Sequence, residues 1–312
     1  MGRAAWNRAS ALGMALILLG AADLAAAGTE DGRGFYFGAD LGVAAPRDLE
    51  STRTNNGITT NCDRWLDRDT LEDGTVVPLP LEDCSPRALP ASPNHFELDS
   101  GFLAGVHLGY DLGSFRLEAE YFHRGHGGEK RSLVVPGDAK QQEFVERSEE
   151  IDDFRADHLF ANLYYDFAGR ESSRLTPYLG FGLGWMKVRM DYSARSLRTD
   201  DKLRLRELGR NSNAAGLLSA GDESLSDSLS GYQWIAGLDY AWSERFSVGL
   251  KLRYGDALDD FEDGGHAWKP LRGHASTVGP TAETGANLPI LYDIEAEELR
   301  FWGISLSFKY RL

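Results

Sequence analysis

The sequence predicts an all-β protein, an eight-stranded antiparallel up-and-down transmembrane β-barrel with four long extracellular loops. Period-2 alternation of apolar residues recurs in eight segments. Short and long connections between these segments alternate strictly along the chain. No run of 18 apolar residues follows the first 30 positions, so the body of the chain contains no spanning helix.

The alternating segments are long enough to cross a bilayer when tilted, because such a strand needs about 9–11 residues. In chain order they are 34–46, 100–112, 114–124, 156–168, 175–192, 230–243, 245–256 and 298–312. The short connections are 112–114, 168–174 and 243–245, and the long ones are 47–99, 125–155, 193–229 and 257–297. Alternate connections of a meander lie at opposite ends, so the long loops share one rim. The short turns and both termini share the other, as in bacterial outer-membrane barrels.

The two faces of each segment differ in side-chain size. In 175–192, for example, Leu179, Phe181 and Leu183 alternate with Gly180 and Gly182. Glycine weakens a strand that faces water, whereas a narrow eight-stranded lumen leaves little room for larger side chains. A soluble barrel of the lipocalin kind, the alternative, would crowd the bulky rows into that lumen. We therefore expect the apolar rows to face lipid.

Aromatic residues gather near the strand ends on the apolar face, as in the aromatic girdles of outer-membrane barrels. The predicted lipid-facing girdle consists of Tyr110, Tyr165, Tyr240, Trp242, Tyr254 and Tyr310.

The N-terminus predicts a secretory signal peptide over residues 1–27. Arg3 and Arg8 precede the short apolar stretch "ALGMALILLGAADLAAA", which ends in small residues. The alternative is a membrane anchor. After cleavage, residues 28–312 are expected to form a single barrel domain.

Export places the chain where disulfides persist. We therefore predict that Cys62 and Cys84 form a disulfide, the alternative being two free thiols.

The signal peptide, the eight strands, the four long loops and the closing "FWGISLSFKYRL" resemble small bacterial outer-membrane β-barrels of the outer-membrane protein A and opacity-protein type. The resemblance implies a multi-pass, porin-like protein of the outer membrane that contacts outer-membrane lipid and lipopolysaccharide. It also implies that the last strand, with Phe308 and Tyr310 in register, is recognised by the barrel-insertion machinery. The family's strand usually ends in Phe, whereas this chain ends in Leu312.

The inward rows carry charges of both signs. The acids are Asp40, Asp111, Glu118, Glu120, Asp166 and Asp239, and the bases are Arg116, Lys251, Arg253, Lys309 and Arg311. The third and seventh strands of an eight-stranded ring lie opposite one another, so Glu118 and Glu120 should reach Lys251 and Arg253. Buried charges must be paired. We predict a lumen ion-pair cluster of Asp40 with these four residues, the alternative being separate charges at the wet rims.

Three functions remain open: a surface-display or structural barrel, a narrow porin-like channel, and a lipid A-modifying enzyme. The third depends on "HAS" at His274–Ser276, which has no placed carboxylate. We therefore expect no enzyme and no catalytic residues. The net charge of −15 argues against nucleic acid as a partner.

No cofactor or metal is expected either. His107 and His158 point inward without metal-ligand spacing, and we expect them to be packed. The acidic stretches Asp63–Gly74 and Asp256–Gly265 miss the calcium-loop spacing and are expected to be charged loops. The segment Asp201–Arg210 predicts either a short helix or an extension of the preceding strand.

Overall fold

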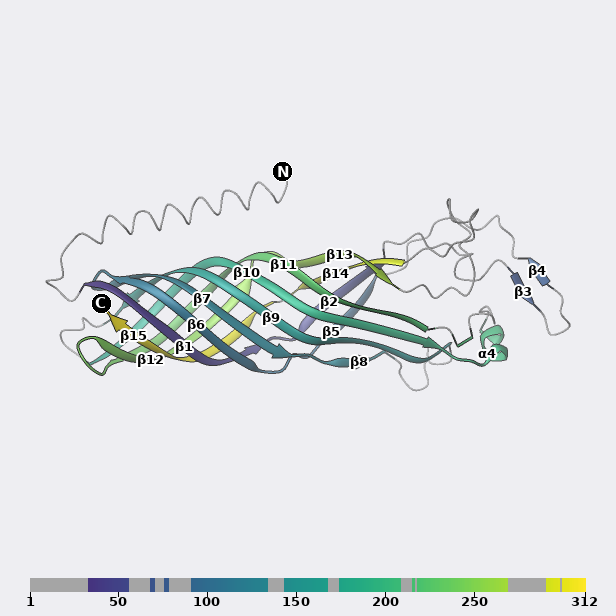
Figure 1. Cartoon of the computed structure of the whole chain (residues 1–312), viewed down its shortest axis with the longest axis horizontal. Coiled ribbons are helices and arrows are strands. Elements are labelled where there is room, and N and C mark those ends of the chain that lie inside the picture. The colour runs from purple at the N-terminus through teal and green to yellow at the C-terminus, as the bar shows by residue number, and fades with distance from the viewer. Residues whose placement is uncertain are drawn as a thin grey trace, which may run out of the picture.

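Eight strands close into an antiparallel barrel in the computed structural model (Figure 1). The structure describes residues 33–55, 68–70, 76–78, 91–133, 143–167, 174–208, 215–216, 218–268, 290–297 and 299–312. The barrel strands are β1 (Gly34–Pro46), β6 (Gly101–Asp111), β7 (Phe115–Gly127), β9 (Phe144–Asp166), β10 (Leu175–Arg198), β11 (Leu218–Ala241), β12 (Phe246–Ala257) and β15 (Phe301–Arg311). Pairing of β1 with β15 completes the ring, which confirms the predicted fold class.

The predicted orientation of the two faces is also confirmed. On β1, Leu41 is 60% exposed, whereas its neighbour Asp40 is fully buried. Gly182 on β10 faces inward, where a Cβ atom would overlap the side-chain oxygen of Asn162. Glycine at this position therefore makes room for a polar side chain from the neighbouring strand.

The six predicted girdle residues divide between the two ends of the barrel. Tyr110, Tyr165, Tyr240, Trp242 and Tyr310 lie near the short turns, and Tyr254 lies at the opposite end of β12. There its ring packs against Trp302 at 5.0 Å and Tyr232 at 6.4 Å between centroids. The aromatic ring at this end of the barrel therefore contains more residues than were predicted, because the prediction included only Tyr254.

Three strands are much longer than predicted. β9 begins at Phe144 instead of 156, β10 ends at Arg198 instead of 192, and β11 begins at Leu218 instead of 230. Further strands occupy stretches predicted to be loops: β2 (Leu49–Asn55), β5 (Ser92–Phe96), β8 (Lys130–Ser132), β13 (Phe261–Trp268) and β14 (Ile290–Glu297). The predicted loop at Asp256–Gly265 is accordingly the end of β12 and the start of β13, so that prediction was wrong.

The wall of the barrel reverses its polarity partway along β10. Trp185 is the last large apolar residue of the outward row before Leu197, which lies near the end of the strand. After Trp185, the side chains of Met186, Val188 and Met190 are buried inside, while Lys187 and Arg189 lie on the outside. β9 behaves in the same way beyond Leu159. Apolar inside and polar outside is the pattern of a sheet in water, which explains why the sequence prediction ended these strands too early.

Strands β2, β5, β8, β13 and β14, with residues 144–158, 186–198 and 218–231 of β9, β10 and β11, are termed the distal extension. Figure 1 shows them continuing the barrel away from its turn end. The pairs β13–β14, β14–β2 and β2–β5 repeat the neighbours β12–β15, β15–β1 and β1–β6 of the barrel below. The interior is an apolar core formed by Leu49, Phe96, Ile151, Phe154, Ala156, Met186, Val188, Met190, Tyr192, Ala194, Leu225, Leu229, Phe261, Tyr292, Ile294, Ala296 and Leu299.

Two seams replace strand ladders in the distal extension. At the β11–β13 seam, Asp263 accepts from the backbone N–H of Ser226 at 2.7 Å, and Asp227 accepts from that of Glu262 at 3.1 Å. At the β5–β8 seam, Glu129 accepts from the backbone N–H of Glu97 at 2.9 Å. These carboxylates accept hydrogen bonds from backbone N–H groups at the edges of the strands, which would otherwise be available to pair with another strand.

Two smaller elements lie beyond these sheets. β3 (Arg68–Thr70) pairs with β4 (Val76–Pro78). Helix α4 (Lys202–Glu207) follows β10, and Asp201 caps it by accepting from the backbone N–H of Arg204 at 2.9 Å. Of the two outcomes predicted for Asp201–Arg210, the short helix is the one that occurs, because β10 ends before this segment at Arg198. Within the described residues no helix is long and apolar enough to cross a membrane.

Candidate functional site: the filled lumen

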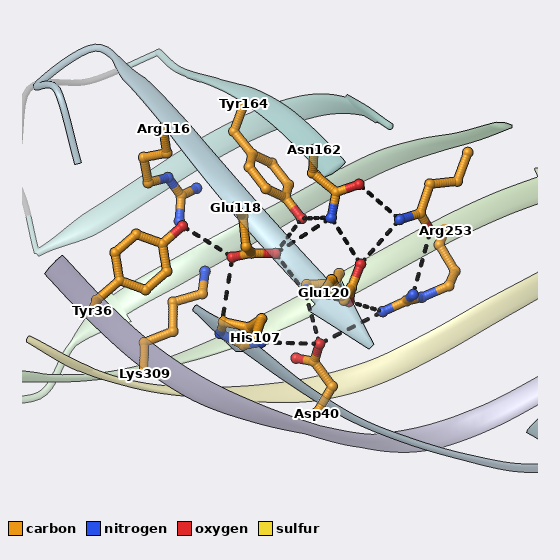
Figure 2. Close-up of polar contacts among 12 residues, drawn as sticks. Tyr36, Asp40, His107, Arg116, Glu118, Glu120, Asn162, Tyr164, Arg253 and Lys309 are labelled. Atoms are coloured by element: carbon orange, nitrogen blue, oxygen red, sulfur yellow. Dashed lines mark hydrogen bonds and ion pairs between the residues drawn. The ribbon is translucent and has the colours of Figure 1, made fainter. Parts of the chain in front are cut away.

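The charged residues predicted to meet in the lumen lie within contact distance of one another (Figure 2). Lys251 Nζ on β12 lies 2.7 Å from Asp40 Oδ2 on β1 and 3.1 Å from Glu120 Oε1 on β7. Arg253 Nη2 lies 2.8 Å from Glu120 and 3.6 Å from Asp40. Glu118 is the more distant partner, 3.8 Å from Lys251. All five side chains are at most 1% exposed, so this lumen ion-pair cluster is shielded from water.

Uncharged polar side chains complete the cluster. Asn162 and Gln233 each donate to Glu120 Oε2, at 2.9 and 3.0 Å. The hydroxyls of Tyr36 and Tyr164 donate to Glu118 at 2.9 and 2.8 Å. Asn162, Tyr164 and Gln233 were missing from the predicted cluster, which contained only residues that are charged at neutral pH. Their position in the inward rows was the signal that would have found them.

A second group of charges lies nearer the turn end. Arg116 binds Asp166 at 2.8 Å and Asp239 at 3.2 Å, and Lys309 binds Asp239 at 2.7 Å. Arg311 reaches Asp111 at 3.0 Å, where the arginine is partly exposed. Every one of the five predicted lumen bases thus contacts a carboxylate, as buried charges require.

An apolar layer covers the lumen ion-pair cluster on the side of the distal extension. It consists of Ala44, Leu103, Phe122, Phe160 and Phe301. The Phe122 ring lies 4.1 Å from the guanidinium carbon of Arg253, so the layer rests directly on the charges. In the sequence, these phenylalanines differ from the lipid-facing ones only in occupying the other of the two alternating rows of each strand.

Arg124 lies above this layer and is fully buried. Its Nε donates to His158 Nε2 at 3.1 Å, and its Nη1 lies 3.0 Å from His126 Nε2. Its guanidinium stacks on Phe154 and Phe301, at 5.1 and 4.3 Å from the ring centroids. Among the described residues no carboxylate forms an ion pair with it. Arg124 was not among the predicted lumen residues.

The two predicted inward histidines are packed against neighbours. His107 Nδ1 lies 3.4 Å from Asp40, and His158 stacks on Phe122 at 4.2 Å. No group of three or more potential metal ligands occurs among the described residues. Residues 1–27, Cys62, Cys84, His274–Ser276 and most of Asp63–Gly74 lie outside them, so those predictions stay untested.

A closed ring of eight strands with an apolar outer surface and a charged interior is the architecture of an outer-membrane barrel. The sequence model of the family described as "Outer membrane protein beta-barrel domain" matches residues 13–280. The chain belongs to this family. It is accordingly a multi-pass β-barrel protein of the bacterial outer membrane, with its long connections on the extracellular side.

The chain also aligns with solved structures, at TM-scores below 0.5. Neisserial surface protein A is 13% identical, with 89% of this chain and 97% of that chain covered and a TM-score of 0.38. OprG from Pseudomonas aeruginosa is 12% identical, with 91% and 99% covered and a TM-score of 0.45. The protease OmpT from Escherichia coli is 10% identical, with 89% and 97% covered and a TM-score of 0.38. No curated protein sequence matches the chain.

Proposed function

We propose that the protein is a closed, non-conducting barrel whose role is structural and surface-displaying: it anchors the distal extension and its loops outside the cell. The observation that carries the proposal is the filling of the interior. A pore needs a continuous polar path, whereas here the path meets ion pairs, then an apolar layer, then an apolar core.

The charged cluster supports a closed state for an energetic reason. Separating Glu120 from both Lys251 and Arg253 would leave buried charges without partners, which costs about 3–5 kcal/mol. Fluctuations of these side chains alone therefore rarely open the lumen at the ion-pair cluster. Even when it opens, Phe122 and Phe301 still stand between it and the extracellular side.

The distal extension supports the display role. Among the described residues its core contains 17 buried side chains, from β2, β5, β9, β10, β11, β13 and β14 and from Leu299 before β15, so the strands outside the membrane hold a fixed shape. Loops carried on a rigid scaffold are the usual position of binding residues. Contact with lipopolysaccharide, and recognition of β15 by the insertion machinery, belong to the same proposal.

Planar-bilayer recordings test the closed lumen. The wild type should show no stable channel, and Glu120→Ala and Lys251→Ala should remain non-conducting because the apolar layer is intact. A large, steady conductance of the wild type would overturn the proposal in favour of the alternative, a narrow porin-like channel. Liposome swelling with small sugars provides an independent measurement of the same property.

The lipid A-modifying enzyme is the weakest candidate, because the sequence places no orienting carboxylate for the His-Ser pair at His274–Ser276. Mass spectrometry of lipid A from cells with and without the protein should show no difference. A mass change that depends on the protein would contradict the assignment as a non-enzyme.

A further inference from the structure

A charged group lies on the outer surface directly beyond the lipid-facing rows of β7, β9 and β10. Tyr121, Leu159 and Trp185 end the continuous apolar part of those rows, and the next large apolar outward side chains, Val145 on β9 and Leu197 on β10, lie near the far ends of the strands. The next outward positions are His123, Asp157 and Lys187, which stand opposite one another in the strand register, and Arg189 follows on β10. Tyr121, His123, Asp157, Lys187 and Arg189 are termed the rim patch.

Asp157 organises the rim patch. Its Oδ1 accepts from the Tyr121 hydroxyl at 2.8 Å and lies 2.9 Å from His123 Nδ1, and its Oδ2 accepts from Arg189 Nη1 at 3.0 Å. Because a carboxylate only accepts, His123 carries its proton on Nδ1 and turns Nε2 away. One acid therefore holds three side chains in fixed positions at the boundary of the membrane.

The rim patch has two positive charges against one negative. Lys187 is exposed and forms no ion pair within the described part of the chain. Arg155 stands opposite Arg189 in the strand register, and it is paired with Asp153 at 2.8 Å and Asp191 at 3.4 Å, one level farther out. Arg155 therefore adds no unpaired positive charge to the rim patch. A net positive patch is unusual in a chain with a net charge of −15.

The opposite wall has the reverse charge beyond its lipid-facing rows. The exposed charged residues described in β2, β14 and the connection before β2 are one base, Arg47, and four acids, Asp48, Glu50, Glu295 and Glu297. Glu50 and Glu297 stand directly opposite each other in the β2–β14 register. An anion at the membrane surface is therefore repelled by that wall and attracted to the rim patch.

We propose that the rim patch binds the phosphate of lipopolysaccharide in the outer leaflet. The acyl chains would lie along Leu159, Leu183 and Trp185, and the phosphate would meet Lys187, Arg189 and the free Nε2 of His123. Lysine and arginine provide charge-assisted hydrogen bonds to phosphate oxygens. The inference rests on the outer-membrane location and is independent of whether the lumen conducts.

Binding of fluorescently labelled lipopolysaccharide to the purified barrel in detergent, followed by anisotropy, tests the proposal. Each basic residue near a membrane surface contributes about 1 kcal/mol toward an anionic lipid. Lys187→Ala combined with Arg189→Ala should therefore weaken binding by about tenfold or more. Lys187→Ala alone should have an intermediate effect. Wild-type binding to lipopolysaccharide lacking the lipid A phosphates should fall to the level of the double variant.

Arg195→Ala provides the matched control, because Arg195 is also exposed on the outward face of β10 but lies eight positions beyond Lys187. That separation is about 27 Å along a strand, beyond the reach of the lipid A phosphates. Its binding should equal that of the wild type. Unchanged binding by the double variant, or an equal loss in Arg195→Ala, would overturn the proposal. Heat-modifiable migration on gels verifies that each variant is folded.

Discussion

Glu120 on β7 and Arg253 on β12 meet across the interior of the barrel, with Arg253 Nη2 2.8 Å from Glu120 Oε1. Both side chains have no exposed surface. Glu120 also accepts from Lys251, Asn162 and Gln233. This carboxylate is therefore the point at which β7, β9, β11 and β12 are joined through side chains.

Glu120→Gln should lower the free energy of unfolding by about 3–5 kcal/mol, because it leaves Lys251 and Arg253 with too little negative charge in a dry interior. Urea-dependent unfolding of the barrel in detergent, followed by its heat-modifiable migration, measures the change. Glu244→Gln, in the exposed turn before β12, removes the same charge and should change stability by less than about 0.5 kcal/mol.

A double-mutant cycle with Arg253→Met separates the contact from general effects of substitution. The two changes should be clearly non-additive, with a coupling energy of about 1–3 kcal/mol, because the side chains share one buried network. Additive costs would mean that the 2.8 Å contact contributes little to stability.

Cysteine labelling distinguishes the membrane-spanning part of the barrel, which is apolar outside, from the distal extension, which is polar outside. In a background with Cys62 and Cys84 replaced by Ser, Leu163→Cys and Leu250→Cys should resist a water-soluble maleimide in intact membranes, because both positions face lipid. Asp191→Cys, outward on β10 beyond Trp185, should react rapidly. Fast labelling at Leu163 would reverse the assigned orientation of the strands.

The closed eight-stranded ring could be predicted because each membrane-spanning strand has one apolar row, so period 2 is visible without three-dimensional information. The distal extension was harder, since the same period continues there with its phase reversed. Trp185 faces out and Met186 faces in, and the sequence "WMKVRMDY" contains this change. An outward apolar row that stops while an inward one begins indicates that a strand has left the membrane.

The partners in the lumen were predictable only in part. Glu120 could be matched with Lys251 and Arg253 because opposite positions in a ring follow from strand count. Asp40 lies on β1, and its closer approach to Lys251 than that of Glu118 depends on strand stagger, which alternation does not reveal. The stacking of Phe122 over Arg253 depends on side-chain rotamers and likewise needed coordinates.

Met190→Ala tests whether the distal extension has a core of its own. Met190 is 1% exposed among apolar neighbours, and truncating such a side chain costs about 2–5 kcal/mol. Limited proteolysis of intact cells should cleave the extension faster, while the barrel keeps its heat-modifiable migration. Ser193→Ala, outward on the same strand, should behave as the wild type. Loss of the barrel itself would show that the two parts unfold together.

Acid should loosen the junction between barrel and distal extension through His126, which lies past Tyr121, the last large lipid-facing residue of β7. His126 Nε2 accepts from Arg124 at 3.0 Å, and Nδ1 donates to the carbonyl of Asp99 at 3.1 Å, so the imidazole is neutral. Burial and the nearby Arg124 charge lower the pKa of His126 from 6.5 to about 4. The opened state therefore binds more protons between these values, and stability falls as the pH drops from about 6.5 to 4.

Hydrogen exchange of the Asp99 amide, which donates to Gly127 at 3.2 Å, reports opening at this junction. His126→Gln is the reference, because its amide oxygen still accepts from Arg124 but does not titrate. The ratio of wild-type to variant exchange rates at each pH removes the intrinsic pH dependence of exchange. That ratio should rise on acidification from pH 7 to 4.5, because only the wild type gains a second buried positive charge beside Arg124. A ratio that stays constant over this range would exclude His126 as the titrating group.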